Sequence, residues 1–436
     1  MAWSDGRRGP VGQAVAGMTT RLGGLPDVET LQRRTLRILV VAQVLSGVGL
    51  TAGITVGGLL GEELMGSRGW SGLPAALFTF GSAITALTVG EISQRHGRRW
   101  GIALGYATAA VGGVATVVAA ATGWVALFLI GMLVYGAGTA TNLLVRYAGT
   151  DLAAPEHRGR AISTVMVATT IGAVAGPNLV DVAGAVATRL GINPLAGSFI
   201  FAVVAYGAAS AVIFTWLRPD PLLVARAHAG ARLVASRARA GDEQEERQVD
   251  WGRIAEATSI LILAQLVMLA VMTMTPVFMR DHNHTLGATG FVISAHVAAM
   301  FLPSPLTGRL VDRFGRRPTM AAGGIVLISA GLAAAAAPPS SMPVIALALV
   351  LLGLGWNLAV VGGTAHITDA APIAKRARIQ GASDVGLAIA GSVGGLSSGL
   401  IVQAESYAVL GQVSALAAAL ALPILLAAAV RTRVAG

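Results

Sequence analysis

The sequence contains no cysteine, which excludes disulfide bonds and metal sites built from thiolates. Charged residues are also scarce, at 12% of the 436 positions, and aromatic residues make up only 5%. A soluble domain carries about 25% charged residues, because its surface must face water. Apolar residues reach 54% instead. The composition therefore excludes an ordinary soluble protein and indicates a chain that lies in a lipid bilayer.

The apolar residues are gathered in runs of about 20, the length that a helix needs to cross the hydrocarbon core of a bilayer. Twelve such runs are present, and each is expected to be a transmembrane helix. They lie near residues 36–61, 70–90, 99–121, 124–147, 160–183, 195–217, 255–279, 286–309, 316–337, 342–366, 377–402 and 405–430.

The net charge of +10 comes from basic residues that lie in alternate connections between these runs. The N-terminal segment, every second connection and the C-terminal tail together hold 28 of the 31 Lys and Arg residues. By the positive-inside rule, both termini and the central loop are expected in the cytoplasm. A basic surface in this position faces anionic lipid, so the charge does not indicate a nucleic-acid partner.

Parts of the sequence recur at a constant offset of 218 residues, which indicates a duplicated six-helix unit. The matches are GEISQRHGRR at 90–99 with GRLVDRFGRR at 308–317, Thr150-Asp151 with Thr368-Asp369, and Arg160 with Arg378. The predicted fold class is therefore all-α, a polytopic membrane protein with twelve transmembrane helices in two six-helix halves.

This repeat divides the chain into five predicted parts, all bounded by the apolar runs. They are a cytoplasmic N-terminal segment (1–35, disordered over 1–30), an N-terminal six-helix bundle (36–217), a cytoplasmic linker (218–254), a C-terminal six-helix bundle (255–430) and a cytoplasmic tail (431–436). The linker is expected because residues 218–254 are polar and charged.

The repeated loop resembles the signature loop of the major facilitator superfamily, G-x-L-x-D-R-x-G-R-R. The second copy is complete, with Gly308, Asp312, Arg313, Gly315 and Arg316. The first copy retains Gly90, Arg95, Gly97 and Arg98 but has Gln94 in place of the aspartate. The resemblance covers essentially the whole chain. It implies a monomeric secondary transporter that works by alternating access, and a bacterial plasma (inner) membrane location with both termini cytoplasmic.

The same resemblance implies that these loops act as a gate. Their glycines permit close helix approach, and their Asp and Arg groups pair in one conformation and separate in another. Gln94 can donate and accept hydrogen bonds but cannot form an ion pair, so we expect a weaker lock in the first half. The alternative is that these arginines serve only as topology anchors.

Methionine and histidine side chains lie on one face of two consecutive predicted helices. Met268 and Met272 are four residues apart on the seventh helix, and His296 and Met300 are four apart on the eighth. If these helices are antiparallel neighbours, Met268 and His296 meet near the middle of the bilayer, at about 1.5 Å of rise per residue. Thioether and imidazole ligands suit a soft cation, of which Cu(I) is the leading case.

The segment MRDHNH follows the seventh helix and adds a second group of possible metal ligands at the outer mouth. They are Met279, His282 and His284. Each methionine pair alone is consistent with ordinary packing, because methionine is a common core residue. A histidine inside a span is less ordinary, since ionisable groups in membranes are costly and mostly functional.

These two motifs, with VMTMTPVFMRDHNH and GLGWNLAVVGGT, are similar to the CcoA-like copper importers, a bacterial branch of the superfamily. The resemblance implies that Met268, Met272, His296 and Met300 bind copper as transported substrate, either the ion or a small chelate, with no cofactor. It also implies import into the cytoplasm. Relatives that lack these ligands carry organic substrates such as riboflavin.

Three further polar residues are candidates for the cavity between the halves, and one acidic residue for a proton relay. The cavity candidates are Gln265, Asn142 and Asn357, and the relay candidate is Asp384. Both asparagines could instead bond between helices, and Asp384 could simply face the inner vestibule.

Three functions remain open. They are copper import, transport of a small riboflavin-like or drug-like solute with proton coupling, and a membrane receptor without turnover. An enzyme is not expected, because no nucleotide loop or catalytic grouping is present.

Overall fold

The structure is a computed structural model, which describes residues 27–66, 73–240 and 249–434. All regular elements in these ranges are helices. The first half contains α2 (Val28–Thr55), α3 (Gly57–Met65), α4 (Leu73–His96), α5 (Arg98–Thr122), α6 (Val125–Tyr135), α7 (Ala137–Ala148), the short η2 (Pro155–His157), α8 (Arg158–Asn178), α9 (Val180–Arg189) and α10 (Ala196–Trp216). The second half contains α12 (Trp251–Asp281), α13 (Leu286–Phe301), α14 (Ser304–Phe314), α15 (Arg316–Ala335), α16 (Met342–Ala370), α17 (Arg376–Ala404), α18 (Tyr407–Ala419) and α19 (Ala421–Val434).

Each predicted span corresponds to one helix or to two helices in succession. Ten segments of the described residues are long and apolar enough to cross a membrane. The two other predicted spans lie on α2–α3 and on α8–α9. The predicted all-α class with twelve spans is therefore confirmed.

Two helices extend beyond the spans predicted for them. Helix α2 begins at Val28, because the Asp27 carboxylate accepts from the backbone N–H of Thr30 at 3.0 Å and caps the first turn. Residues 28–35 are therefore helical, and residues 1–26 lie outside the described part. At the other end, α19 continues to Val434, so the predicted tail is helical where it is described.

The predicted linker contains a helix, α11 (Pro221–Ala240), that was not predicted. Asp220 accepts from the backbone N–H groups of Leu222 and Leu223 at 3.0 and 3.2 Å. Pro221 follows as the first helical residue, a position where its missing N–H has no cost. An aspartate cap followed by proline is a helix start signal.

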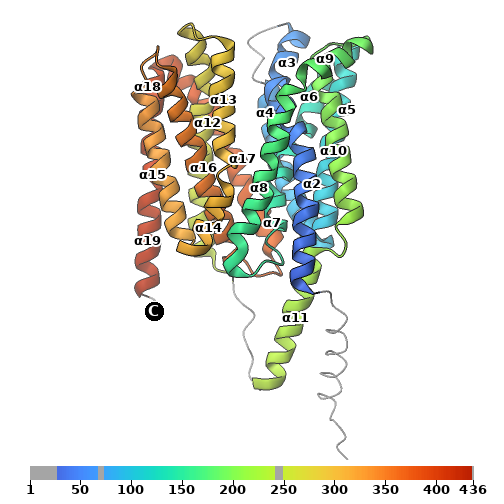
Figure 1. The fold of residues 1–436 in the computed structure, drawn as a ribbon, viewed down its shortest axis with the longest axis vertical. Helices are drawn as coiled ribbons and strands as arrows, with labels where there is room; N and C mark the ends of the chain where they lie inside the picture. The colour runs from blue at the N-terminus through green and yellow to red at the C-terminus, as the bar shows by residue number, and fades with distance from the viewer. Residues whose placement is uncertain (1–26, 67–72, 241–248, 435–436) are drawn as a thin grey trace, which may run out of the picture.

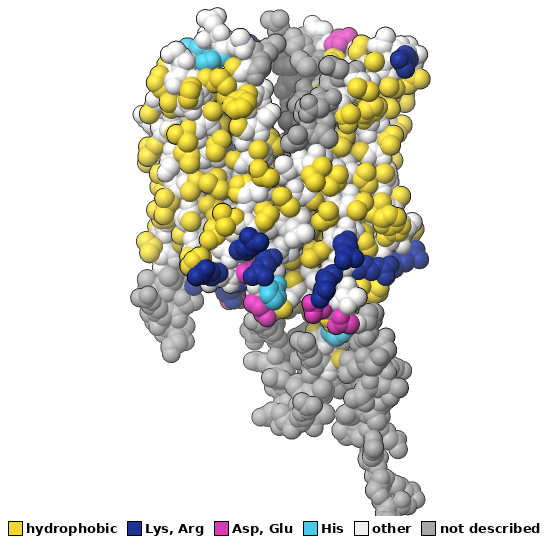
Figure 2. All heavy atoms as spheres, viewed as in Figure 1, with side chains coloured by type: hydrophobic (Ala, Val, Ile, Leu, Met, Phe, Trp, Pro, Cys, Tyr) yellow, Lys and Arg dark blue, Asp and Glu magenta, His cyan; other side chains and the backbone are white. Residues whose placement is uncertain are grey.

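The helices form two bundles that lie side by side, with α2 to α10 in one and α12 to α19 in the other (Figure 1). Helix α11 and the C-terminus project at the same end of the molecule (Figure 1). On the face shown in Figure 2, Lys and Arg side chains gather mainly at that end, which we call the basic end. The clustering of positive charge predicted from the sequence is therefore present in three dimensions.

The two bundles contact each other through equivalent helix pairs, α4 with α17 and α8 with α14. Glycine permits both crossings at close range. A Cβ on Gly90 would lie 3.0 Å from the Cα of Gly381, and a Cβ on Gly308 would lie 2.5 Å from the carbonyl oxygen of Gly159. In a membrane, helices associate through such close packing of small residues rather than through the hydrophobic effect.

Candidate functional site

Each signature loop contains, near its end, a glycine in a conformation that other residues rarely adopt. Gly97 has φ +94° and ψ 167°, and Gly315 has φ +95° and ψ 172°. Each caps the start of the following helix, α5 or α15. This region of φ and ψ is essentially restricted to glycine, so the backbone geometry accounts for both residues.

Three residues before each of these glycines, the side chain of Gln94 or Asp312 caps the start of a helix in the opposite half. Asp312 accepts from the backbone N–H groups of Gly159 and Arg160 at 2.8 and 3.1 Å. Gln94 accepts from the backbone N–H of Ala377 at 2.9 Å. Gly159 and Ala377 are equivalent positions, 218 residues apart. Both loops therefore bind the start of an opposing helix, α8 or α17, where the helix dipole favours an acceptor.

The side chain of Gln94 adds a bond that an aspartate cannot make, since its amide donates to the carbonyl oxygen of Ala374. Gln94 cannot form an ion pair, but Glu91, about one turn earlier on α4, forms one with the opposite half. Glu91 accepts from Arg378 of the opposite half at 2.6 and 2.7 Å. Sequence reasoning overlooked Glu91, although it lies within the repeated segment. The first loop thus combines a neutral cap with a separate ion pair.

The arginines of the two loops have different environments. Arg95 is exposed and donates to Glu91 at 2.5 Å, and Arg313 lies over the ring of Phe314 at 5.3 Å. Arg98 and Arg316 are bound within their own halves, Arg98 to Asp151 at 2.7 Å and Arg316 to Asp369 at 2.8 Å.

Three of the arginines that pair with Asp151 or Asp369 also cross between the halves. Arg98 donates to Gln380 at 2.5 Å, Arg158 donates to Asp369, and Arg316 donates to the carbonyl oxygen of Pro155. Together with the loop caps, these bonds join the halves at the basic end.

A buried charge pair joins the halves above these loops. Arg146 of α7 donates to Asp384 of α17 at 2.6 Å, and both side chains are at most 2% exposed. Arg146 also donates to the hydroxyl of Thr364 at 2.9 Å and to the carbonyl oxygen of Leu143. The second carboxylate oxygen of Asp384 is buried without a hydrogen-bond partner. Asp384 is therefore bound between the halves, not simply exposed to a vestibule.

Arg146 is one of the 28 Lys and Arg residues that were counted in the N-terminal segment, the alternate connections and the tail, and for this residue the assignment to a connection was wrong. Arg146 lies inside α7 and is 1% exposed. The available signal was its position at the end of a predicted span, four residues after Asn142 on the same helix face.

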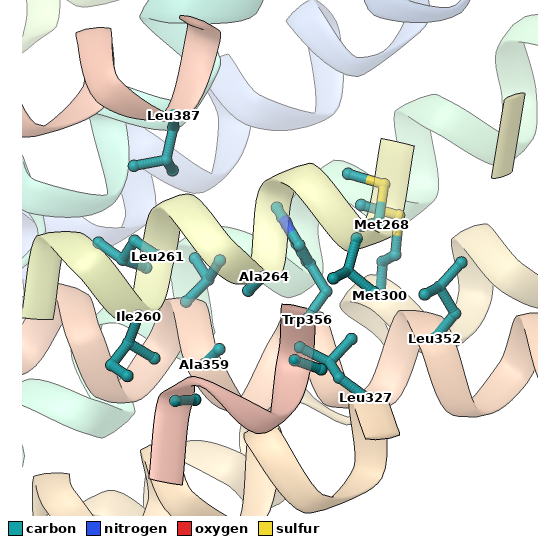
Figure 3. Packing of buried hydrophobic residues seen from close by; sticks show 14 of the residues in the cluster. Ile260, Leu261, Ala264, Met268, Met300, Leu327, Leu352, Trp356, Ala359 and Leu387 are labelled. Atoms are coloured by element: carbon teal, nitrogen blue, oxygen red, sulfur yellow. The ribbon is translucent and has the colours of Figure 1, made fainter. Parts of the chain in front are cut away.

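The methionine and histidine residues of the second half are mostly buried. His296 is 0% exposed, Met268 is 4% and Met300 is 8%, while Met272 packs against the same core at partial burial. In the view of Figure 3, the thioether ends of Met268 and Met300 extend toward the same region. These residues thus supply soft donor atoms within one buried cluster of the C-terminal half.

His296 is bonded to α16. Its Nδ1 lies 2.8 Å from the carbonyl oxygen of Leu349, which can only accept, so the neutral ring carries its proton on Nδ1. Nε2 then retains a free lone pair, and it is buried with no hydrogen-bond partner among the residues that the structure describes. Helix α16 packs closely against both α12 and α13, which themselves meet at few positions. Direct contact between α12 and α13 is therefore present but limited, and α16 lies against both helices.

The outer group of possible ligands is spread over different environments. Met279 is 0% exposed, whereas His282 is exposed. His282 Nδ1 contacts the carbonyl oxygen of Phe278 at 2.8 Å, and His284 Nε2 contacts that of Pro339 at 2.7 Å. One nitrogen of each histidine is therefore engaged by the protein backbone.

The cavity candidates of the second half bond between helices. Asn357 donates to the carbonyl oxygen of Met300 and to the hydroxyl of Ser304, both at 2.7 Å, and accepts from Thr307 at 2.6 Å. These bonds connect α16 to the end of α13 and to the first residues of α14, on both sides of the break between these two helices. Gln265 accepts from the indole N–H of Trp356 at 2.8 Å.

Asn142 belongs to a neutral polar cluster in the first half. Its side-chain oxygen lies 2.5 Å from the hydroxyl of Ser46 and 3.0 Å from that of Tyr106. Gln43 accepts from Tyr106 at 2.8 Å and donates to Thr169 at 2.9 Å. The amide nitrogen of Asn142 is buried without a partner.

Comparison with known proteins identifies the chain's relatives. It matches the Major Facilitator Superfamily over residues 39–278 and 257–435. It is 47% identical over 396 residues to the uncharacterized MFS-type transporter YddS of Bacillus subtilis, an alignment that covers 91% of each chain. It is 33% identical over 374 residues to the riboflavin transporter RfnT of Brucella anthropi, covering 81% of this chain and 85% of the relative.

The fold is also similar to solved structures. The human organic anion transporter MFSD10 has a TM-score of 0.74 at 16% identity, covering 90% of this chain and 99% of that one. Such identity reports on the fold alone.

Proposed function

Because the chain belongs to the major facilitator superfamily and is a secondary transporter, we propose that it carries a small organic solute, with riboflavin as the first compound to test. The observation that carries this proposal is the similarity to a named riboflavin transporter over 81% of the chain. The neutral cluster of Gln43, Ser46, Tyr106 and Asn142 supports it. Amide and hydroxyl groups suit an uncharged, hydrogen-bonding solute better than an ion.

We further propose that the described state is closed at its cytoplasmic side. The basic end is the cytoplasmic end by the positive-inside rule, in a bacterial plasma membrane. The caps made by Gln94 and Asp312 and the pair Arg146–Asp384 hold the halves together there. Release of solute into the cell requires these bonds to break, which is the alternating-access step.

Asp384 is the proposed proton-coupling residue. Its free carboxylate oxygen provides the position for a proton, and protonation removes the charge that holds Arg146. Loss of that attraction would favour separation of α7 from α17. The proposal thus couples proton binding to the gate through one bond.

Copper import is a second candidate, favoured by one specific observation. The lone pair of His296 Nε2 is buried and free, in the half that also buries the soft donors Met268 and Met300. Imidazole and thioether ligands suit Cu(I). Copper would be the cargo here, not a cofactor.

Uptake measurements separate these functions. A bacterial host that lacks riboflavin synthesis and uptake is given wild type, Asp384→Asn or His296→Ala at matched membrane abundance. Riboflavin uptake with wild type that is lost with Asp384→Asn and retained with His296→Ala supports the organic-solute proposal. A rise in cellular copper that is lost with His296→Ala supports copper import instead. If wild type changes neither, both cargoes are wrong.

A further inference from the structure

The linker helix α11 brings an arginine to the basic end of the first half. Leu222 and Val224 are 0% and 8% exposed, so the first turn of α11 packs against the bundle. Arg226 lies about one turn beyond Leu222. The charged groups that act on it are Asp151, Arg98 and Asp220.

One edge of the Arg226 guanidinium has no partner. Its Nε and Nη2 atoms are both buried, and neither makes a hydrogen bond among the described contacts. These two N–H groups point in parallel from one side of the planar ion, the arrangement that binds both oxygens of a carboxylate or phosphate. Buried donors are nearly always satisfied, so an empty bidentate edge indicates a missing acceptor.

The neighbouring carboxylates are already engaged. Both oxygens of Asp151 accept from Arg98, at 2.7 and 3.2 Å. Asp220 accepts the backbone N–H groups of Arg99, Leu222 and Leu223. Among the described contacts, neither carboxylate accepts a hydrogen bond from the Nε or Nη2 of Arg226.

A third arginine adds to the positive charge. Arg376 is 8% exposed, and its Nε donates to the backbone carbonyl of Ala371 at 3.3 Å. Asp151 is the first of the charged groups that act on Arg376. Asp151 is therefore a shared neighbouring charge of Arg226 and Arg376, and Asp220 acts on Arg226 as well.

The equivalent aspartate in the second half is paired differently. There Asp369 accepts from Arg316 on one oxygen and from Arg158 on the other. Arg376 is the counterpart of Arg158 at 218 residues, so the repeat alone would predict that it pairs with Asp151. In the first half that pair is replaced by the bidentate bond from Arg98, and α11 adds a further arginine. The additional arginine from α11 is thus a feature of the first half.

We propose that the Nε–Nη2 edge of Arg226, at the first turns of α11, binds an oxyanion of the phosphate class where α11 meets the gate. The anion supplies the acceptor that none of the described residues gives to Arg226, and it offsets the repulsion between Arg226 and Arg98. Because this site lies at the basic end and not among the cargo candidates, it goes beyond the proposed transport function. It makes the closed state of the gate sensitive to a bound anion.

Thermal unfolding of the purified full-length protein in detergent tests this site. The probes are potassium phosphate and potassium chloride at equal ionic strength. Phosphate is expected to raise the apparent Tm of wild type by about 2–4 °C relative to chloride. Arg226→Gln should abolish this shift, and Arg226→Lys should reduce it, since an ammonium cannot bind in bidentate fashion. The matched control Arg280→Gln removes an exposed charge at the end of α12 and should retain the shift.

A second arm distinguishes a lipid headgroup from free phosphate. Phosphatidylglycerol and phosphatidylcholine are added to the same variants. Stabilisation by phosphatidylglycerol alone, lost with Arg226→Gln, would assign the site to a lipid phosphate. In chloride, Arg226→Gln should be at least as stable as wild type, because it removes an unpaired charge. The proposal is overturned if neither probe stabilises wild type, if Arg226→Gln keeps the shift, or if Arg226→Gln unfolds in chloride.

Discussion

Arg146 donates to the hydroxyl of Thr364 at 2.9 Å, and the two residues occupy the same position in the two repeats, 218 residues apart. The bond therefore lies where the two halves face each other about their internal symmetry. One half supplies a cation at this position and the other a neutral hydroxyl. The carboxylate that balances Arg146 comes from Asp384 on the neighbouring helix α17.

Replacing only one member of the pair Arg146–Asp384 should lower the stability of the protein more than replacing both. Arg146→Gln or Asp384→Asn leaves one buried charge without its partner, which costs about 3–5 kcal/mol. The double substitution removes both charges and should recover most of the lost Tm while still abolishing proton-coupled uptake. Tm and uptake of the three variants at equal abundance check this. A double variant no more stable than the singles would show that the pair is not a unit.

The two loop caps should hold the basic end closed. Asp312→Ala and Gln94→Ala each remove a helix cap, worth about 1 kcal/mol. Each should shift the protein toward a state open at that end. The chain has no cysteine, so Ser163→Cys in the buried α8–α14 crossing provides a unique label site. Maleimide labelling of that cysteine should rise with Asp312→Ala. Unchanged labelling would argue against a gate there.

The loop glycines should not tolerate a side chain. Gly97→Ala and Gly315→Ala place a Cβ on backbone with φ near +95°, a strain of about 1–3 kcal/mol. Gly207→Ala on α10 is the matched control, because a Cβ added there would meet no atom within 4 Å. Both loop variants should unfold at lower temperature than the control. Equal Tm values would contradict the argument from backbone conformation.

Asn357 should be needed to hold the break between α13 and α14. Asn357→Ala leaves the hydroxyls of Ser304 and Thr307 and the carbonyl of Met300 without their partner, at about 1–3 kcal/mol. The variant should lose stability and also lower any copper uptake through displacement of Met300. Gln265→Ala is a useful comparison, since it removes one interhelix bond in the same half. A stable Asn357→Ala protein would assign that residue to the cavity instead.

Much of the candidate site could be predicted, although some of its partners could not. The repeat identified Gly97, Gly315 and Asp312 because their roles are local, set by backbone conformation and loop position. Arg146 was read as a topology marker because it stands at the end of an apolar run. Its partner Asp384 is 238 residues away, and nothing in either segment indicates the other.

The sequence by itself determined the helical class, the twelve spans, the basic end and the duplicated unit, because these depend on composition, run length and spacing. The tertiary structure alone decided which arginine meets which aspartate and which way each helix is turned. A helix in a bilayer is apolar on nearly all sides, so its pattern does not set its rotation. That rotation is why His296 bonds to Leu349 of α16, a contact fixed by packing between segments 53 residues apart.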